Sequence, residues 1–438
     1  MLLVCSLFPS EPFQAYKARF RGAACNSYSH FAADVRCGSF EAGCGLNLSH
    51  REVRKSYIGL HSSWIAKCCL TGQRRTMEAF QLLVLLTCLI SVAAAGSASR
   101  SKAKAMFVFG DSLVDAGNNN FINSIARANF APNGIDFPNS APTGRFCNGK
   151  IISDLLSDYM GTPPILPVLD PQAKGQNLLL GVNFASAGAG ILDDTGTIFI
   201  QRLTMTDQFR LFRKYKSDLA AVAGASAAAK LISDGIYSFT VGGNDYINNY
   251  LLLFAQRARQ YTPSQFNALL IATLRNQLKT VYSLGARKVT VSNMGPIGCI
   301  PSQLQRSSRA GECIQELNDH ALSFNAALKP MIEGLNRELK GATFVYVNSY
   351  DILNEYIQNP SKYGFQYTNM ACCGQGSYNG LLTCTGLSNL CSDRTKYVFW
   401  DAFHPSESIN RLITNRLLNG PPSDLSPFNV KQLIAMST

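Results

Sequence analysis

Histidine is scarce in this chain, with five residues among 438. Histidine is the side chain whose ordinary pKa lies closest to neutral pH, so its scarcity leaves few candidates for acid–base catalysis. Three of the five, His30, His50 and His61, precede the segment where we expect the folded protein to begin. His320 and His404 therefore remain as the candidate general bases.

Clusters of basic residues, internal repeats and proline- or serine-rich linkers are also lacking after residue 99. The net charge is +12, but the lysines and arginines are scattered along the chain, which argues against a nucleic-acid partner. The hydrophobic fraction, 46%, is typical of a globular protein. Without a linker, residues 99–438 are expected to form a single domain.

The apolar run at residues 80–92 is too short to span a bilayer, so no membrane span is expected from it. It begins shortly after Met77 and leads into small residues that would allow cleavage after Ala95 or Ala98. This pattern is typical of a secretory signal peptide, which we assign to residues 77–98. The protein is therefore predicted to be secreted and extracellular.

The stretch before the signal peptide, residues 1–76, lacks a helical or strand period. Signal peptides stand at the start of a chain, so we interpret this stretch as a non-structural N-terminal extension. We expect synthesis to start at Met77, with the preceding residues coming from an over-extended gene model; the alternative is a real pre-sequence with unknown targeting. In both cases the mature fold is expected to begin near residue 99.

Most of the cysteines that follow the signal peptide are expected to pair, because an oxidising compartment favours disulfides. Cys299 and Cys313 flank a polar loop that a disulfide would close. Cys147 is left over and is expected to be a buried free thiol.

The remaining four cysteines lie close together near the C-terminus. Cys372 and Cys373 are adjacent, and a bridge between neighbours is strained. Each is therefore expected to pair with Cys384 or Cys391, in an order that the sequence leaves open.

Short apolar runs alternate with helical patterns after Ala103, and five runs are candidate strands: AMFVFGDS, LLLGVNFASAGAGI, GIYSFTVGGND, ARKVTVSNMGP and GATFVYVNSYD. In one of the helical patterns, Thr262 is the expected N-cap, Pro263 the first helical residue and Gly285 the residue just past the end. The alternation predicts an α/β fold with mostly parallel strands and helices on both faces of the sheet.

Three of these candidate strands end in unusual turns, GDS, ASAGAG and GGND. In open α/β sheets, ligands bind beyond the carboxyl ends of the strands, so the three turns are expected to meet at one edge. Ser112 would present a hydroxyl there, Gly188 and Gly190 backbone N–H groups, and Asn244 a side-chain amide. Taken singly, each also fits an ordinary helix cap, tight turn or turn asparagine.

The segment WDAFHPS, near the C-terminus, supplies an Asp–His pair. Pro405 disfavours a helical conformation for His404, which should therefore lie on a turn within reach of Asp401. A buried aspartate would orient the imidazole as a serine nucleophile requires. His320 lies within an amphipathic helical pattern and is interpreted as structural or solvated. We therefore expect His404 to deprotonate Ser112.

Several stretches resemble the plant-type GDSL esterase/lipases of the SGNH-hydrolase superfamily. FVFGDSLVDAGNN resembles the first family block, NFASAGAGI the second, VGGNDY the third and WDAFHPSE the fifth, and PTGRFCNGK and ACCGQGSYNG resemble the plant branch. The resemblance runs from about residue 104 to residue 420. It implies a flavodoxin-like three-layer αβα sandwich with a central, mostly parallel five-stranded sheet.

The resemblance also implies a carboxylic ester hydrolase acting on lipid, cutin-like or small acyl esters, without metal or cofactor. Ser112, Asp401 and His404 would be catalytic, and Ser112, Gly188 and Asn244 would form the oxyanion hole. The location would be the apoplast or cell wall, where the net positive charge would favour an anionic cell-wall surface. No Asn-x-Ser/Thr sequon follows the signal peptide, so N-glycosylation of the mature enzyme is not expected.

Two alternatives use the same scaffold. An acyltransferase would pass the acyl group to a hydroxyl of a cell-wall or cuticle polymer, and a catalytically silent protein would only bind. The intact set of catalytic residues argues against the silent protein. Phe121, Ile122, Phe130 and Phe137 are candidates to line an acyl groove, and core packing explains them equally well.

Overall fold

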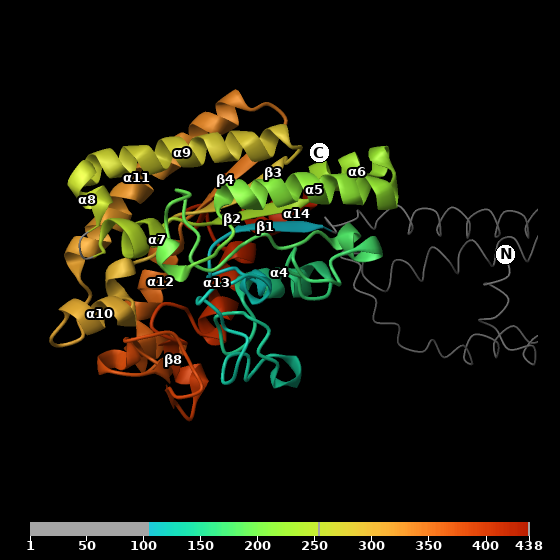
Figure 1. Ribbon diagram of the computed structural model, residues 1–438. Coiled ribbons are helices and arrows are strands. Elements are labelled where there is room, and N and C mark those ends of the chain that lie inside the picture. Colours follow the sequence, from blue (N-terminus) through green and yellow to red (C-terminus); the bar gives the residue numbers. More distant parts are fainter. Residues whose placement is uncertain (1–104, 253–254, 437–438) are drawn as a thin grey trace, which may run out of the picture. The chain divides into compact units, whose positions relative to one another are not determined.

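The computed structural model describes residues 105–252 and 255–436, and the expected N-terminal extension and signal peptide lie outside them. A five-stranded sheet has the order β1 (Met106–Gly110), β2 (Ile236–Thr240), β3 (Lys288–Ser292), β4 (Thr343–Val347) and β9 (Leu425–Ser426). The first four strands are parallel and β9 pairs with β4 antiparallel. The predicted mostly parallel sheet is thus confirmed (Figure 1).

The second predicted strand, at residues 178–191, was only partly correct. Its start belongs to the 3₁₀ helix η4 (Gly175–Leu180), and Asn183 makes isolated bridges to Val108 and Pro167 instead of a strand. The segment still runs beside β1, because Phe184 N–H donates to Val108 O at 2.7 Å. The segment lies on the side of β1 opposite β2, which agrees with the order of chain segments in a flavodoxin-like fold.

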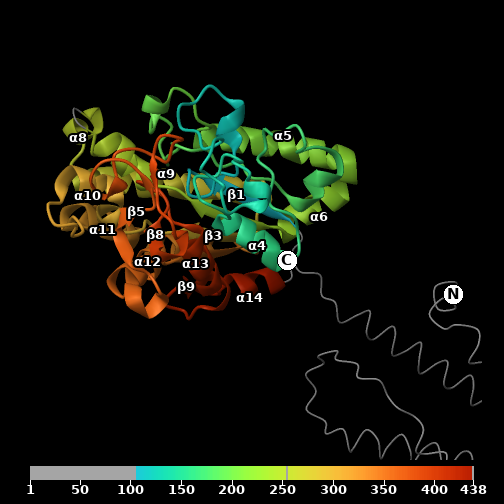
Figure 2. The ribbon, with the colours of Figure 1, turned by 90° about the horizontal axis from the view of Figure 1, so that it is seen from below.

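Helices cover both faces of the sheet, as expected (Figures 1 and 2). One face carries α5 (Met205–Ala223), α6 (Ala225–Asp234), α9 (Pro263–Ser283) and α11 (Gln315–Glu338). The other carries α4 (Ile152–Met160), α12 (Ser349–Gln358), α13 (Glu407–Asn419) and α14 (Val430–Ala435).

Shorter elements lie mainly in the connections: α7 (Gly243–Asp245), the π-helical turn η6 (Tyr246–Tyr250), α8 (Gln256–Gln260), α10 (Pro301–Ser307), β5 (Tyr367–Ala371), β6 (Cys373–Gly374), β7 (Asn389–Leu390) and β8 (Tyr397–Phe399). Among the helices that the structure describes, none has both the length and the apolar character needed to cross a bilayer.

The helix boundaries follow from local chemistry. Thr262 caps α9 by accepting a hydrogen bond from Gln265 N–H at 3.3 Å, while Gln265 Oε1 accepts from Thr262 N–H at 2.9 Å. This reciprocal pair is a capping box, and Pro263 occupies the first turn as predicted.

The two faces of the sheet carry different side chains. Large aromatic residues fill the face toward α5, α9 and α11: Phe107, Phe109, Tyr237, Phe239, Phe344 and Tyr346. On the opposite face, the central strands carry small hydroxyl residues: Ser238, Thr240, Thr290 and Ser292. Successive side chains of a strand point to opposite faces. The difference between the two faces therefore follows from the alternation of large apolar and small hydroxyl residues along β2 and β3.

The three disulfides agree with the pairings that were predicted from the sequence. Cys299 bonds Cys313, as predicted. Of the two orders left open, the structure has Cys372 with Cys391 and Cys373 with Cys384. Cys147 is a buried free thiol, also as predicted, and burial raises its pKa far above the ordinary value.

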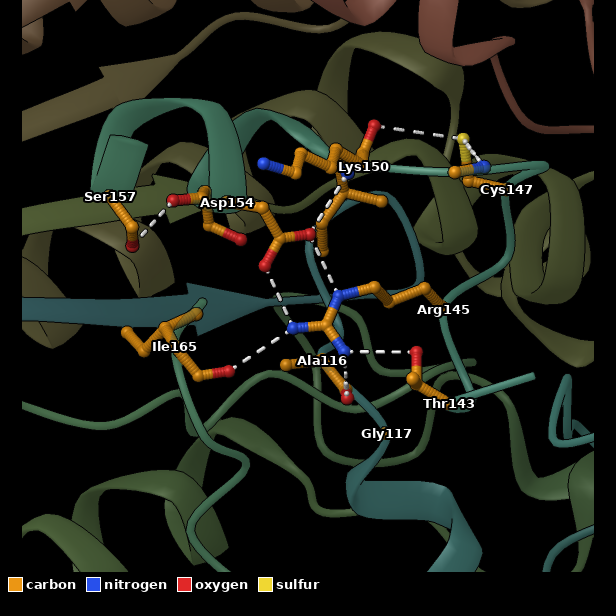
Figure 3. Close-up of polar contacts among 12 residues, drawn as sticks. Ala116, Gly117, Thr143, Arg145, Cys147, Lys150, Asp154, Ser157 and Ile165 are labelled. Atoms are coloured by element: carbon orange, nitrogen blue, oxygen red, sulfur yellow. Dashed lines mark hydrogen bonds and ion pairs between the residues drawn. The ribbon is translucent and has the colours of Figure 1, made fainter. Parts of the chain in front are cut away.

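A buried ion pair ties α4 to the loop after β1 (Figure 3). The Arg145 guanidinium donates to both carboxylate oxygens of Asp154, each at 2.8 Å. It also donates to Ala116 O and Thr143 Oγ1, both at 3.0 Å, and to Ile165 O at 3.2 Å. The arginine therefore joins three segments of the chain around one charge.

Replacing this arginine should destabilise the fold. In Arg145→Ala the carboxylate of Asp154 stays buried without its counter-ion, which typically costs about 3–5 kcal/mol. The free energy of unfolding in urea, with disulfides intact, measures the loss. Lys214→Ala, which removes an exposed pair with Asp218 on α5, is the control and should cost about 0–1 kcal/mol. A loss in Arg145→Ala no greater than in the control would contradict the assigned role.

Candidate active site

The three turns expected to converge do meet at one cavity. Ser112 follows β1, Asn244 lies in α7 after β2, and Gly188 lies in the segment beside β1. All three line a cavity of about 470 Å³, together with His404 from the loop after β8. The three turns therefore converge at one edge of the sheet, as expected because parallel strands present their carboxyl ends there.

Ser112, His404 and Asp401 form a continuous hydrogen-bonded chain. Asp401 Oδ1 lies 2.7 Å from His404 Nδ1, and His404 Nε2 lies 2.8 Å from Ser112 Oγ. A carboxylate can only accept here, so Nδ1 carries the proton and donates to Asp401. Nε2 is then the acceptor for the Ser112 hydroxyl, which is the arrangement of a nucleophile beside its general base.

The loop that carries the Asp–His pair is held from several sides. Asp401 Oδ1 also accepts from the backbone N–H groups of Phe403 and His404, each at 2.9 Å. Trp400 N–H donates to His404 O at 2.7 Å, and the Phe146 ring lies 4.8 Å from the His404 ring, centroid to centroid. Asp401 and His404 are both buried, so the pair is shielded from water.

The disulfide region fastens this loop further. Cys372 N–H donates to Phe399 O at 3.0 Å, and Cys373 N–H donates to Trp400 O at 2.7 Å. Both residues thus bond to the backbone immediately before Asp401, and both are cross-linked to later parts of the chain.

Ser112 and Gly188 line the same cavity, and each has a backbone N–H group to offer there. Within residues 105–252 and 255–436, neither the Ser112 nor the Gly188 N–H donates a hydrogen bond to another residue. Gly188 has φ +84°, and a Cβ there would lie 2.4 Å from the Phe199 ring. The position therefore requires glycine for both its backbone conformation and its close packing.

The Asn244 side chain is oriented by its neighbours. Its amide nitrogen donates to Ala189 O at 2.9 Å, and its oxygen accepts from Asn248 Nδ2 at 2.7 Å. Asn248 lies in the π-helical turn η6, a type of irregularity that is frequent at functional sites. A primary amide has two N–H donors, so Asn244 keeps one for the cavity.

Two buried carboxylates that the sequence reasoning missed join the three turns. Asp115 accepts from Gly117, Asn118 and Ala187 N–H groups at 2.7–2.9 Å. Ala187 directly precedes Gly188, so this bond fixes the turn that presents the glycine amide. Burial raises the pKa of Asp115 to about 6, while the N–H donors oppose the rise.

Asp245 performs the equivalent task for the third turn. Its carboxylate accepts from Ile191 N–H at 2.7 Å, Leu192 N–H at 3.0 Å and Thr195 Oγ1 at 2.7 Å. Burial raises its pKa to about 6 as well. The only sequence signal was position: Asp245 adjoins Asn244, and Asp115 lies three residues after Ser112.

Several other candidates lie away from the site. His320, which lies in α11, stacks on Tyr246 of η6 with 5.4 Å between the ring centroids. This contact agrees with a structural role. Gly190 does not line the cavity. The four residues that were candidates for an acyl groove or for core packing, Phe121, Ile122, Phe130 and Phe137, do not line the cavity either, and none of them is buried, so neither suggestion was correct. Within residues 121–137, Ile125 and Ala126 line the cavity instead.

The amino-acid sequence is similar to those of known esterases and lipases over most of its length. The family model of GDSL-like lipase/acylhydrolases matches residues 106–417. GDSL esterase/lipase At4g28780 of Arabidopsis thaliana is 44% identical over 337 residues, covering 77% of this chain and 92% of the relative. GDSL esterase/lipase LTL1 of the same plant is 43% identical over 342 residues, covering 78% of this chain and 93% of the relative.

Asp111 should make stability depend on pH. Burial raises its pKa from 3.8 to about 7, so the folded state keeps a proton that the unfolded state loses near pH 4. The stabilising contribution of this proton is complete below pH 3.8 and is lost as the pH rises to about 7. In Asp111→Asn the melting temperature should therefore fall less than in the wild type between pH 4 and pH 7. If the melting temperatures of both proteins changed equally between pH 4 and pH 7, the raised pKa of Asp111 would be contradicted.

Proposed function

The chain belongs to the GDSL-like lipase/acylhydrolase family and is a carboxylic ester hydrolase, and from this we propose that it is a secreted enzyme that cleaves lipid, cutin-like or small acyl esters through an acyl-enzyme on Ser112. The observation that carries the proposal is the hydrogen-bonded chain from Asp401 through His404 to Ser112, with distances of 2.7 and 2.8 Å.

The first step is acylation. His404 Nε2 takes the proton of the Ser112 hydroxyl as Oγ attacks the ester carbonyl carbon. The imidazolium that forms is stabilised by the Asp401 carboxylate on Nδ1. His404 then gives the proton to the leaving alkoxide, so that the alcohol departs and the acyl group stays on Ser112.

The negative charge on the carbonyl oxygen needs donors that are already in place. The Ser112 and Gly188 N–H groups and the second amide hydrogen of Asn244 supply them in our proposal. Support comes from their shared cavity and from the absence of other described partners for the two backbone groups. Donors fixed before the reaction need no reorganisation, which lowers the barrier.

Deacylation repeats the same chemistry with water. His404 removes a proton from water as the water oxygen attacks the acyl carbonyl, and then returns the proton to Ser112 Oγ. The products are a carboxylic acid and the regenerated enzyme.

Secretion is supported by the apolar run at residues 80–92 and by three disulfides, which form in oxidising compartments. We place the enzyme in the apoplast or cell wall.

Replacing the nucleophile should abolish both labelling and turnover. In Ser112→Ala, covalent labelling by a fluorophosphonate and hydrolysis of p-nitrophenyl esters should disappear, because no oxygen remains to form the acyl-enzyme. The exposed Ser283→Ala variant is the control and should behave as wild type. Equal labelling of both variants would reject Ser112 as the nucleophile.

Removing the side-chain oxyanion donor should slow the reaction without preventing folding. Asn244→Ala is expected to lower kcat by roughly 10²–10³-fold, since one such donor contributes about 3–4 kcal/mol of transition-state stabilisation. Steady-state kinetics on p-nitrophenyl butyrate measures the effect, and Asn177→Ala, at an exposed position, is the control. An unchanged kcat in Asn244→Ala would remove this residue from the mechanism.

A further inference from the structure

The cavity at Ser112 extends well beyond the catalytic groups. Its wall includes Ile236, the first residue of β2, and Val430, the first residue of α14. Ser112, in contrast, follows the carboxyl end of β1. The cavity therefore runs from the carboxyl edge of the sheet toward the amino ends of the strands. We call this inner part the interlayer chamber, because it lies between the sheet and the layer of α4, α13 and α14.

Small side chains on the sheet create the chamber. Ser238 and Thr240 of β2 and Thr290 and Ser292 of β3 form neighbouring cross-strand pairs on this face, and all four line the cavity. Buried parallel strands usually carry large aliphatic residues on both faces. Ser238 and Thr240 remain partly exposed although β2 is a central strand, which shows that the helices do not close over them.

The opposite wall is mainly apolar. The second helical layer contributes aliphatic side chains: Ile152 and Leu156 from α4, Ile413 and Leu417 from α13, and Val430 from α14. Its polar member, Asn410 of α13, donates its amide hydrogens to Cys147 Sγ and Lys150 O. Among the described lining residues, the ionisable ones are Asp111 and His404, both beside Ser112 at the catalytic end. An uncharged chamber with an aliphatic wall suits a hydrocarbon chain better than a sugar or another polar group.

The mouth of the cavity is apolar as well. Leu113, Ile125, Ile198 and Leu382 line it, and all four are exposed, with 66% of Ile125 and 59% of Leu382 accessible. Large apolar residues grouped around an opening favour the entry of an apolar ligand.

The length of the chamber indicates the size of the chain. From Thr240 to Ile236 the strand advances four residues, or about 13 Å at roughly 3.3 Å per residue. An extended hydrocarbon advances roughly 1.3 Å per carbon, given a C–C bond of about 1.5 Å, so about ten carbons cover this distance.

We propose that the interlayer chamber receives the acyl chain of the substrate, and that the enzyme is selective for esters of acids with about ten or more carbons. The inference rests on the proposed function, since it assumes that Ser112 attacks the carbonyl at the mouth. The chain would lie along β2 and β3, with the alcohol portion directed outward.

The wild-type enzyme provides the first test. The kcat/KM for p-nitrophenyl dodecanoate should exceed that for the acetate at least tenfold. Labelling by a fluorophosphonate with a dodecyl chain should likewise be faster than labelling by one with an ethyl chain. A preference for acetate, or equal labelling rates, would overturn the inference while Ser112-dependent hydrolysis of acetate still upheld the proposed function.

Filling the chamber provides the second test. Ser238→Leu adds a branched side chain inside it, and should lower kcat/KM for the dodecanoate at least tenfold while leaving butyrate within about twofold of wild type. Ser238→Ala removes the same hydroxyl without filling space and should keep dodecanoate activity. Leu417→Phe narrows the chamber from the helical wall and should repeat the pattern of Ser238→Leu.

The outcomes separate the two proposals. Loss of dodecanoate hydrolysis with retained butyrate hydrolysis supports the chamber. Unchanged dodecanoate hydrolysis in both filling variants, or an equal loss on both esters with normal fluorophosphonate labelling, rejects it. Absence of Ser112-dependent hydrolysis of every ester would instead reject the proposed function.

Discussion

Buried carboxylates that accept backbone N–H groups hold the candidate site together. Asp115 ties the segment after Ser112 to the turn before Gly188, and Asp245 ties the same turn region to the segment after β2. In the part of the chain that the structure describes, neither carboxylate accepts a hydrogen bond from a lysine or arginine; N–H and O–H donors stabilise the charge, and for Asp115 the more distant Arg145 contributes as well. The site therefore depends on backbone geometry, because a shift of any turn would leave a buried carboxylate without its donors.

The two faces of the sheet differ in how tightly they are packed. Its aromatic face packs tightly against α5, α9 and α11, with rings such as Phe109 and Phe239 stacked at 4.9 Å between centroids. On its other face, the central strands β2 and β3 carry small hydroxyl residues, and a chamber remains there. A cavity lowers the stability of a fold, and the rest of the core must offset this loss. The tight packing of the aromatic face therefore allows the opposite face of the sheet to remain incompletely packed. The same strands thus position Ser112 and form the floor of the proposed acyl site.

Much of this organisation follows from the sequence, and the exceptions have physical reasons. Continuous apolar runs predicted β1 to β4, and the convergence of their carboxyl ends predicted which turns would meet. The run at residues 178–191 is as apolar as a strand, but Gly181 and the bonds of Asn183 to neighbouring loops replace most of its ladder. Asp115 and Asp245 looked like ordinary turn residues because burial depends on the whole fold. The chamber could not be predicted, since it depends on how closely distant helices approach Ser238.

The distance along the chain between the proposed nucleophile and its proposed base has a consequence for biosynthesis. His404 follows Ser112 by 292 residues, and the backbone just before its loop accepts hydrogen bonds from Cys372 and Cys373, which are themselves disulfide-bonded to Cys391 and Cys384. At about 5–20 residues per second, a ribosome needs roughly 15–60 s to pass from one to the other. Throughout that interval the proposed nucleophile lacks its proposed base, so on this mechanism the nascent chain is inactive. Esterase activity becomes available only to a finished and folded molecule.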